Sequence, residues 1–128
     1  MSSSEHSEPG VLDLERALSR LAGDEEMFGE LAEIFLRESP RWMALLEKSV
    51  AEEDAAGVFR AAHDLKGSTD VFCAAAAVKA AQNMEKMGRE ERLAGADEAL
   101  GALKAEVVWV RNELRDYLNR HSKRPESG

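Results

Sequence analysis

The residues with the clearest capacity for chemistry surround one histidine near the middle of the chain. His63 is followed by Lys66 at i+3 and Gly67 at i+4, and Arg60 precedes it at i−3. On an α-helix these spacings place side chains on a common face. A neutral imidazole is a nucleophile, and a cation one turn away can stabilise negative charge that arrives on it. The spacing therefore permits a histidine that accepts an anionic group such as a phosphoryl group.

Gly67 adds to this pattern, because a glycine inside a helix costs about 1 kcal/mol relative to alanine. Its missing side chain would let a partner approach the imidazole. Other interpretations stay open at this point. A lone histidine on a helix is most often structural or simply exposed, a lysine at i+3 is most often a solvated charge, and a glycine can serve tight helix packing. These positions alone are compatible with a histidine that accepts a phosphoryl group, but they do not distinguish it from the other interpretations.

The element that carries His63 is expected to be a helix over about 54–70. On a wheel of about 100° per residue, His63 lies roughly 100° from the centre of the core stripe, at the edge of the buried face, where it reaches solvent. Phe59 and Ala56 lie on the same side and could flank a docking surface, although Phe59 could equally belong to the core. Asp70 also lies near this face. The core stripe is formed by Ala55, Val58, Ala62, Leu65 and Thr69.

The rest of the chain is expected to be helical as well, because apolar residues recur every three or four positions and no alternating strand pattern occurs. A break is expected at Pro40, since the residue before a proline avoids the helical region. We expect an all-α fold: an antiparallel four-helix bundle preceded by two cap helices. The cap helices are predicted at about 11–21 and 24–38, and the bundle helices at about 40–51, 54–70, 74–88 and 93–120.

The polar ends, 1–10 and 121–128, are predicted to be disordered tails around a single domain over 11–120. The last helix carries a seam with alternating spacings of four and three, which could pack inside one bundle or form an intermolecular coiled coil. Packing inside the bundle is the favoured interpretation. Val108 and Trp109 lie off this seam and could contact the N-terminal helices or form a partner surface.

Composition narrows the function classes. The net charge of −8 disfavours nucleic acid and anionic membranes as partners. No apolar run approaches the roughly 18 residues of a membrane span, and the N-terminus lacks the order of a signal peptide, so a cytoplasmic protein is expected. A lone cysteine excludes an intrachain disulfide, and without a His-x-x-x-His or Glu-x-x-His pair no metal site is predicted. No Gly-rich nucleotide loop occurs, so we expect no ATP binding, no autonomous kinase activity and no cofactor.

The stretch Ala62-His63-Asp64-Leu65-Lys66-Gly67-Ser68 resembles the phosphorylation motif of histidine-containing phosphotransfer (HPt) domains, Ala-His-x-Leu-Lys-Gly-Ser/Ala. The resemblance covers roughly residues 11–118. Residues 14–24 look like the family's N-terminal cap helix, and residues 35–39, Phe-Leu-Arg-Glu-Ser, look like its second helix. Met84-Glu85 falls where the family usually has Leu-Glu on the helix after the histidine.

This resemblance implies a four-helix bundle with an exposed, phosphorylatable histidine. It implies shuttling of phosphoryl groups between aspartates of receiver domains in a histidine–aspartate phosphorelay that includes a histidine kinase, often a hybrid one. His63 would carry the phosphoryl group, Lys66 would stabilise it and Gly67 would leave room for the receiver, which would supply Mg²⁺. The adjacent helix would border the site with Gln82, Glu85 and Lys86. A monomer is the default expectation.

The sequence departs from the family pattern ten residues after the histidine, where Cys73 replaces a usual glycine. If that position needs a positive φ, Cys73 would be strained. We interpret it as a small buried hydrophobe rather than a redox switch. The preceding residues 69–72 are also atypical, and the charge of Asp70 could weaken phosphate retention or help to choose the receiver.

Three alternatives compete with a phosphocarrier. A helical docking module that carries no phosphate is disfavoured by the intact set of His63, Lys66 and Gly67. The phosphoacceptor domain of a chemotaxis-type kinase is disfavoured because the chain starts at Met1 and ends soon after the last helix, although a fragment of a hybrid kinase would look the same. A helical metal protein lacks the expected ligand pairs.

Overall fold

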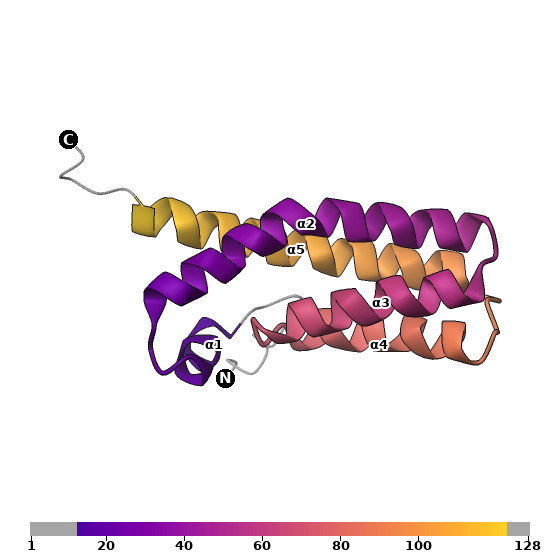
Figure 1. The fold of residues 1–128 in the computed structure, drawn as a ribbon, viewed down its shortest axis with the longest axis horizontal. Helices are drawn as coiled ribbons and strands as arrows, with labels where there is room; N and C mark the ends of the chain where they lie inside the picture. Colours follow the sequence, from indigo (N-terminus) through magenta and orange to yellow (C-terminus); the bar gives the residue numbers. More distant parts are fainter. Residues whose placement is uncertain (1–12, 123–128) are drawn as a thin grey trace, which may run out of the picture.

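The computed structural model describes residues 13–122 and contains five helices, which are α1 (Leu14–Arg20), α2 (Glu25–Ala51), α3 (Ala55–Asp70), α4 (Ala75–Arg89) and α5 (Ala96–Ser122). No strand occurs between residues 13 and 122, so the prediction of an all-α fold is confirmed. The four long helices lie side by side, with α1 at one end near the start of α2 (Figure 1). Because α2 and α4 each contact both α3 and α5, the long helices form a closed ring. None of the described helices combines the length and apolar character needed to cross a bilayer.

The ring encloses a continuous apolar core, in which aromatic residues cluster at the end near α1. Phe72 packs edge-on against Phe28 and Phe35, with ring centroids 5.5 and 5.7 Å apart. The seam of α5 lies inside this core, as the favoured interpretation expected. Its fully buried members are Leu103, Val107, Val110 and Leu114.

Three of the helices begin at aspartates. The carboxylates of Asp13, Asp24 and Asp54 accept hydrogen bonds from the third backbone N–H after each of them. These bonds satisfy N–H groups that have no partner within the helix, which is why α1, α2 and α3 begin where they do. The predicted tail over 1–10 lies outside the described residues, as does 123–128 of the second tail, whereas α5 continues to Ser122.

The C-terminal turns of α2, α3 and α4 each contain a non-glycine residue in the left-handed region, namely Glu53 (φ 55°), Cys73 (φ 54°) and Glu91 (φ 57°). Each such residue lets the next N–H bond back to a carbonyl of the last helical turn. Cys73 is half-buried rather than fully buried. The family that the sequence resembles usually has glycine at this position, and here the position does adopt a positive φ. Cys73 therefore carries the backbone strain expected from the sequence.

The predicted break at Pro40 is wrong, because the expected helices 24–38 and 40–51 form one helix, α2. A proline inside a helix leaves the carbonyl four residues earlier without its N–H partner. Here that carbonyl belongs to Leu36, and Nη1 of Arg111 from α5 donates to it at 2.8 Å. The helix continues because another helix supplies the missing donor. Figure 1 shows α2 changing direction between its two halves, as expected for a helix that contains proline.

The expected start of the last helix at 93 is also wrong, since α5 begins at Ala96. Gly95 has φ +84°, outside the right-handed helical region. The N–H of Ala96 instead donates to the carbonyl of Leu93 at 2.9 Å and closes a turn before the helix. The connection between α4 and α5 is longer than the hydrophobic pattern alone suggested.

Candidate functional site

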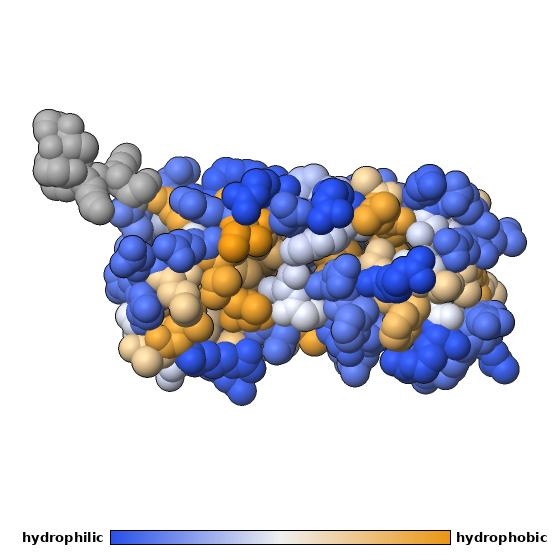
Figure 2. Space-filling model, in the orientation of Figure 1, coloured by the Kyte–Doolittle hydropathy of each residue, from blue (hydrophilic) through white to orange (hydrophobic). Residues whose placement is uncertain are grey.

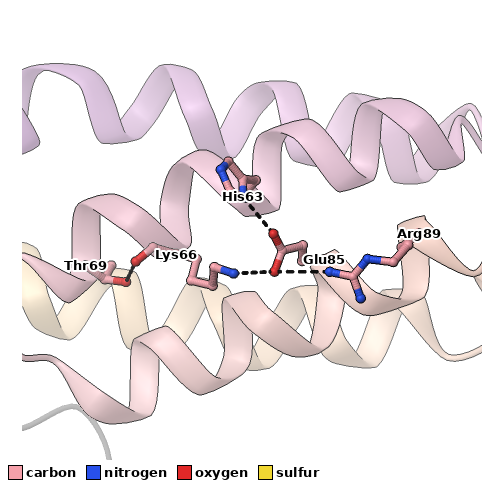
Figure 3. Close-up of polar contacts among 5 residues, drawn as sticks. All are labelled: His63, Lys66, Thr69, Glu85 and Arg89. Atoms are coloured by element: carbon pink, nitrogen blue, oxygen red, sulfur yellow. Dashed lines mark hydrogen bonds and ion pairs between the residues drawn. The ribbon is translucent and has the colours of Figure 1, made fainter.

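The imidazole of His63 lies on the surface of α3, with its side chain 59% exposed. Its Nδ1 is 2.7 Å from Oε2 of Glu85 on α4 (Figure 3). An ionised carboxylate only accepts hydrogen bonds, so Nδ1 carries the proton in the neutral ring. The geometry therefore leaves the lone pair on Nε2. Exposure of His63 agrees with its position at the edge of the core stripe.

Glu85 is the buried centre of this site, with its side chain only 3% exposed. Its Oε1 accepts a hydrogen bond from Nζ of Lys66 at 2.7 Å and lies 3.8 Å from Nη2 of Arg89. Burial raises the pKa of Glu85, but the hydrogen bonds from Lys66 and His63 outweigh this effect and hold the pKa below its ordinary value of 4.5. Glu85 therefore stays a carboxylate that orients the imidazole and gathers two cations beside it.

An aromatic ring limits the freedom of the imidazole on one side. The ring of Phe59 stacks against His63 with centroids 5.9 Å apart and an interplanar angle of 17°. The guanidinium of Arg89 lies 5.7 Å from the centre of the same ring. Phe59 is half-buried, so its side chain is part of both the core and the surface of the site.

Gly88 allows α3 and α4 to approach closely next to this site. A Cβ atom at Gly88 would lie 2.6 Å from the backbone N of Phe59 and 2.7 Å from the carbonyl oxygen of Ala55. No side chain fits there without moving one of the helices. Because Glu85 precedes Gly88 by one turn, the close approach also sets the distance over which its carboxylate reaches His63. Small residues of both helices are fully buried, namely Ala62 of α3 and Ala77 and Ala81 of α4.

Hydrogen bonds in the core and at the surface fix the last turn of α3. The hydroxyl of Thr69 donates to the carbonyl of Leu65 at 2.8 Å and lies 3.2 Å from that of Lys66, so its polar atom is satisfied inside the core. Arg20 of α1 donates to the carbonyl of Asp70 at 2.9 Å and lies 3.4 Å from its carboxylate. Asp70 thus connects α3 to α1 and makes no polar contact with His63 in the described part of the chain.

The other predicted site residues lie on two helices, α3 and α4. Gly67 is exposed, and a Cβ atom placed on it would meet nothing within 4 Å. Ala56 and Arg60 are exposed on the same face of α3. On α4 the structure brings only Glu85 to His63, because Gln82 and Lys86 are exposed and form no hydrogen bond or ion pair with it within residues 13–122.

Two residues of the site were missed by the sequence reasoning. Arg89 lies four residues after Glu85, and this acid–base spacing on a helix was the available signal for it. Gly88 was interpreted only as the end of a helix, whereas it lies inside α4. No local pattern separates a glycine that ends a helix from one that permits close packing.

An apolar cleft lies beside the site, between α2 and the end of α3. Figure 2 shows hydrophobic residues gathered on this face of the molecule. Among the residues that line the cleft, Ile34 is the most exposed, at 41%. The cleft lies on the side of α3 that carries Ser68, one residue after Gly67. It is lined by Leu31, Ile34, Phe35, Trp42, Ser68, Val71 and Phe72.

Comparison with known proteins identifies the family. The family model described as Hpt domain matches residues 30–120. The chain belongs to the Hpt domain family. The crystal structure of histidine-containing phosphotransfer protein B from Pseudomonas aeruginosa PAO1 shares the fold, with a TM-score of 0.78 and 23% identity over 85% of this chain and 95% of that one. A search of curated proteins gave no match. Hpt domains are phosphocarriers rather than kinases, which supports a role for this chain in histidine phosphotransfer.

Proposed function

We propose that the protein accepts a phosphoryl group on Nε2 of His63 and donates it again, to and from aspartates of receiver domains in a two-component phosphorelay. One observation carries the proposal. The exposed imidazole has its Nδ1 held at 2.7 Å by the buried carboxylate of Glu85. A fixed tautomer with a solvent-facing lone pair is what a histidine nucleophile requires.

The transfer follows from this geometry. The Nε2 lone pair attacks the phosphorus of a receiver's aspartyl phosphate, so a P–N bond forms while the acyl phosphate P–O bond breaks. The receiver's aspartate leaves as a carboxylate, and the proton on Nδ1 stays in its hydrogen bond to Glu85. The imidazole gains positive charge as the new bond forms, and the adjacent carboxylate stabilises that charge. Donation to another receiver is the same step in reverse.

Two cations are available to the new phosphoryl group. Nζ of Lys66 and the guanidinium of Arg89 both lie beside Glu85, and both side chains are long enough to turn towards the imidazole. In the unphosphorylated protein Glu85 balances part of their charge. When three anionic oxygens arrive on Nε2, the cations can shift towards them, because a phosphoryl group is a stronger acceptor than one shared carboxylate. Mg²⁺ is expected on the receiver and would supply Lewis acid chemistry there.

The receiver would dock on the exposed face of α3 and on the apolar cleft beside it. Gly67 offers room for close approach, and Ala56 and Arg60 extend the same face away from the cleft. An apolar centre with a polar rim is typical of protein interfaces. We further propose that the ring of long helices is an antiparallel four-helix bundle, that the protein works in the cytoplasm beside a hybrid histidine kinase, and that it has no kinase activity of its own.

The test is transfer of a radioactive phosphoryl group. A panel of receiver domains from the same genome is charged with ³²P-labelled acetyl phosphate and mixed with the protein. We expect acid-labile label on the wild type and none on a His63→Gln variant that keeps its helical circular dichroism. His121→Gln is the matched control, since His121 is also exposed on a helix and bonds only to the carbonyl of Tyr117 within residues 13–122. Label that persists on His63→Gln, or absence of label on the wild type with every receiver, would overturn the proposal.

A second measurement addresses the tautomer. Long-range ¹H–¹⁵N spectra of the unphosphorylated protein at pH 8 should report the proton of His63 on Nδ1. In a Glu85→Ala variant the preference should disappear, and transfer should slow by about 10- to 100-fold, the range found when a group that orients a metal-bound histidine is lost. A proton on Nε2 in the wild type would contradict the assignment of Nε2 as the nucleophile.

A further inference from the structure

The outward face of α5 carries an uncharged stripe that the core does not use. Val108 is 48% exposed and Trp109 is 40% exposed. Around them, exposed small or amide side chains cover three turns of the helix without one charge, in a chain of which 33% is charged. Single exposed apolar residues are ordinary, but a contiguous set is unusual on a monomer. We call this set the α5 outer stripe, and it consists of Gly101, Ala102, Ala105, Val108, Trp109 and Asn112.

The outer stripe lies on the side of the molecule away from His63. In the ring of long helices α5 packs against α2 and α4, while α3 stands opposite. The buried seam of α5 faces inward, so the outer stripe faces away from α3. A partner on this stripe would not cover the phosphotransfer site. Trp109 is 40% exposed, so it is not part of the buried core and much of its surface is open to a partner.

The spacing of the outer stripe fits pairing with another helix. Positions 101, 105, 108 and 112 follow intervals of four, three and four, which is the seam pattern of a coiled coil. If two copies of α5 run antiparallel with this seam between them, residue 101 lies opposite 112 and residue 105 opposite 108. In this register each Val108 meets the small side chain of Ala105 in the second copy.

The same register pairs opposite charges at both ends of the stripe. Residue 98 falls opposite residue 115, so Glu98 of each copy meets Arg115 of the other. Both side chains are exposed, and Arg115 donates only to Asn112 at 3.2 Å among the described residues. A parallel pair would instead place Glu98 against Glu98. The stripe is therefore complementary to its own reversed copy, as a two-fold interface requires.

We propose that two copies of this protein associate through the α5 outer stripe, with their α5 helices antiparallel. The pair is weak and reversible, because a stripe of six residues stands at the low end of interface sizes. Both copies keep His63 exposed, so the pair presents two phosphotransfer sites on its opposite outer faces. This inference goes beyond the proposed function and does not depend on it.

The test is the mass of the protein in solution as its concentration rises. Sedimentation equilibrium should show 14.1 kDa at low micromolar protein and a rise towards twice that mass at roughly millimolar protein. The variants E98R and R115E should each weaken association roughly tenfold or more, because each places two pairs of like charges in contact. Mixed together, the two variants should pair again, since every contact then joins opposite charges.

Several outcomes decide the proposal. Restored association in the mixture, together with a concentration-dependent blue shift of tryptophan emission that is absent in Trp109→Phe, supports the α5 pair. A mass of 14.1 kDa at every concentration overturns it, and so does association that E98R and R115E leave unchanged. Thermal melts of each variant confirm that the fold is kept. A Val108→Lys variant gives a second readout, and it should stay monomeric while its phosphotransfer per His63 is unchanged.

Discussion

Replacement of Gly67 by alanine should stabilise the protein and slow its reaction at the same time. Gly67 lies inside α3, and a Cβ atom there would meet nothing within 4 Å, so the new methyl group causes no clash in the free protein. Alanine is favoured over glycine in a helix by up to about 1 kcal/mol. For a chain of this length, that gain raises the melting temperature by roughly 3–5 °C.

The effect on transfer has the opposite sign. If a receiver approaches His63 across the bare backbone at Gly67, the methyl group of alanine stands in the interface. Overpacking of a close contact costs typically about 1–3 kcal/mol. This cost corresponds to a loss of roughly 5- to 150-fold in kcat/KM for phosphotransfer. The assay is rapid-quench transfer of label from a phosphorylated receiver, with urea melts on the same samples.

Gly101→Ala is the matched control. Gly101 is also exposed inside a helix with open space where a Cβ atom would stand, but it lies on α5. At low micromolar protein it should gain the same stability and keep the wild-type rate. Equal rates for Gly67→Ala and wild type would refute the idea that Gly67 serves close approach. A lower melting temperature for Gly67→Ala would refute the reasoning from helix propensity.

Four further changes test other parts of the structure. Gly88→Ala should destabilise by about 1–3 kcal/mol in urea melts, because its methyl group would meet backbone atoms of α3 2.6 and 2.7 Å away. Cys73→Gly should stabilise by about 1 kcal/mol in the same assay, because it relieves a left-handed residue that carries a side chain. Arg111→Met should cost about 1–3 kcal/mol in thermal melts, because it leaves the carbonyl of Leu36 without a donor. Glu85 has a folded pKa below its ordinary 4.5, so its ionised form contributes stability above that pH, and this contribution is lost as the pH falls through the folded pKa. Urea melts from pH 7 to pH 3 should therefore show a smaller loss of stability in Glu85→Gln than in the wild type.

The sequence by itself determined the parts of the site that depend on neighbouring residues. The common face of His63, Lys66 and Gly67 follows from 3.6 residues per turn, and so does the exposure of the imidazole at the edge of the core stripe. The all-α fold follows from the same periodicity. These features need only local geometry, which is why short-range patterns were sufficient to predict them.

Only the tertiary structure decided the features that join distant residues. Glu85 reaches His63 across 22 positions, and the sequence could propose three candidates on that helix without choosing among them. The close packing at Gly88 that sets this distance has no local signature. Pro40 was expected to end a helix, and α2 continues because Arg111, 75 positions from Leu36, supplies the missing hydrogen bond. The local sequence shows which backbone group lacks a hydrogen-bond partner. Only the packed fold determines which side chain supplies that partner.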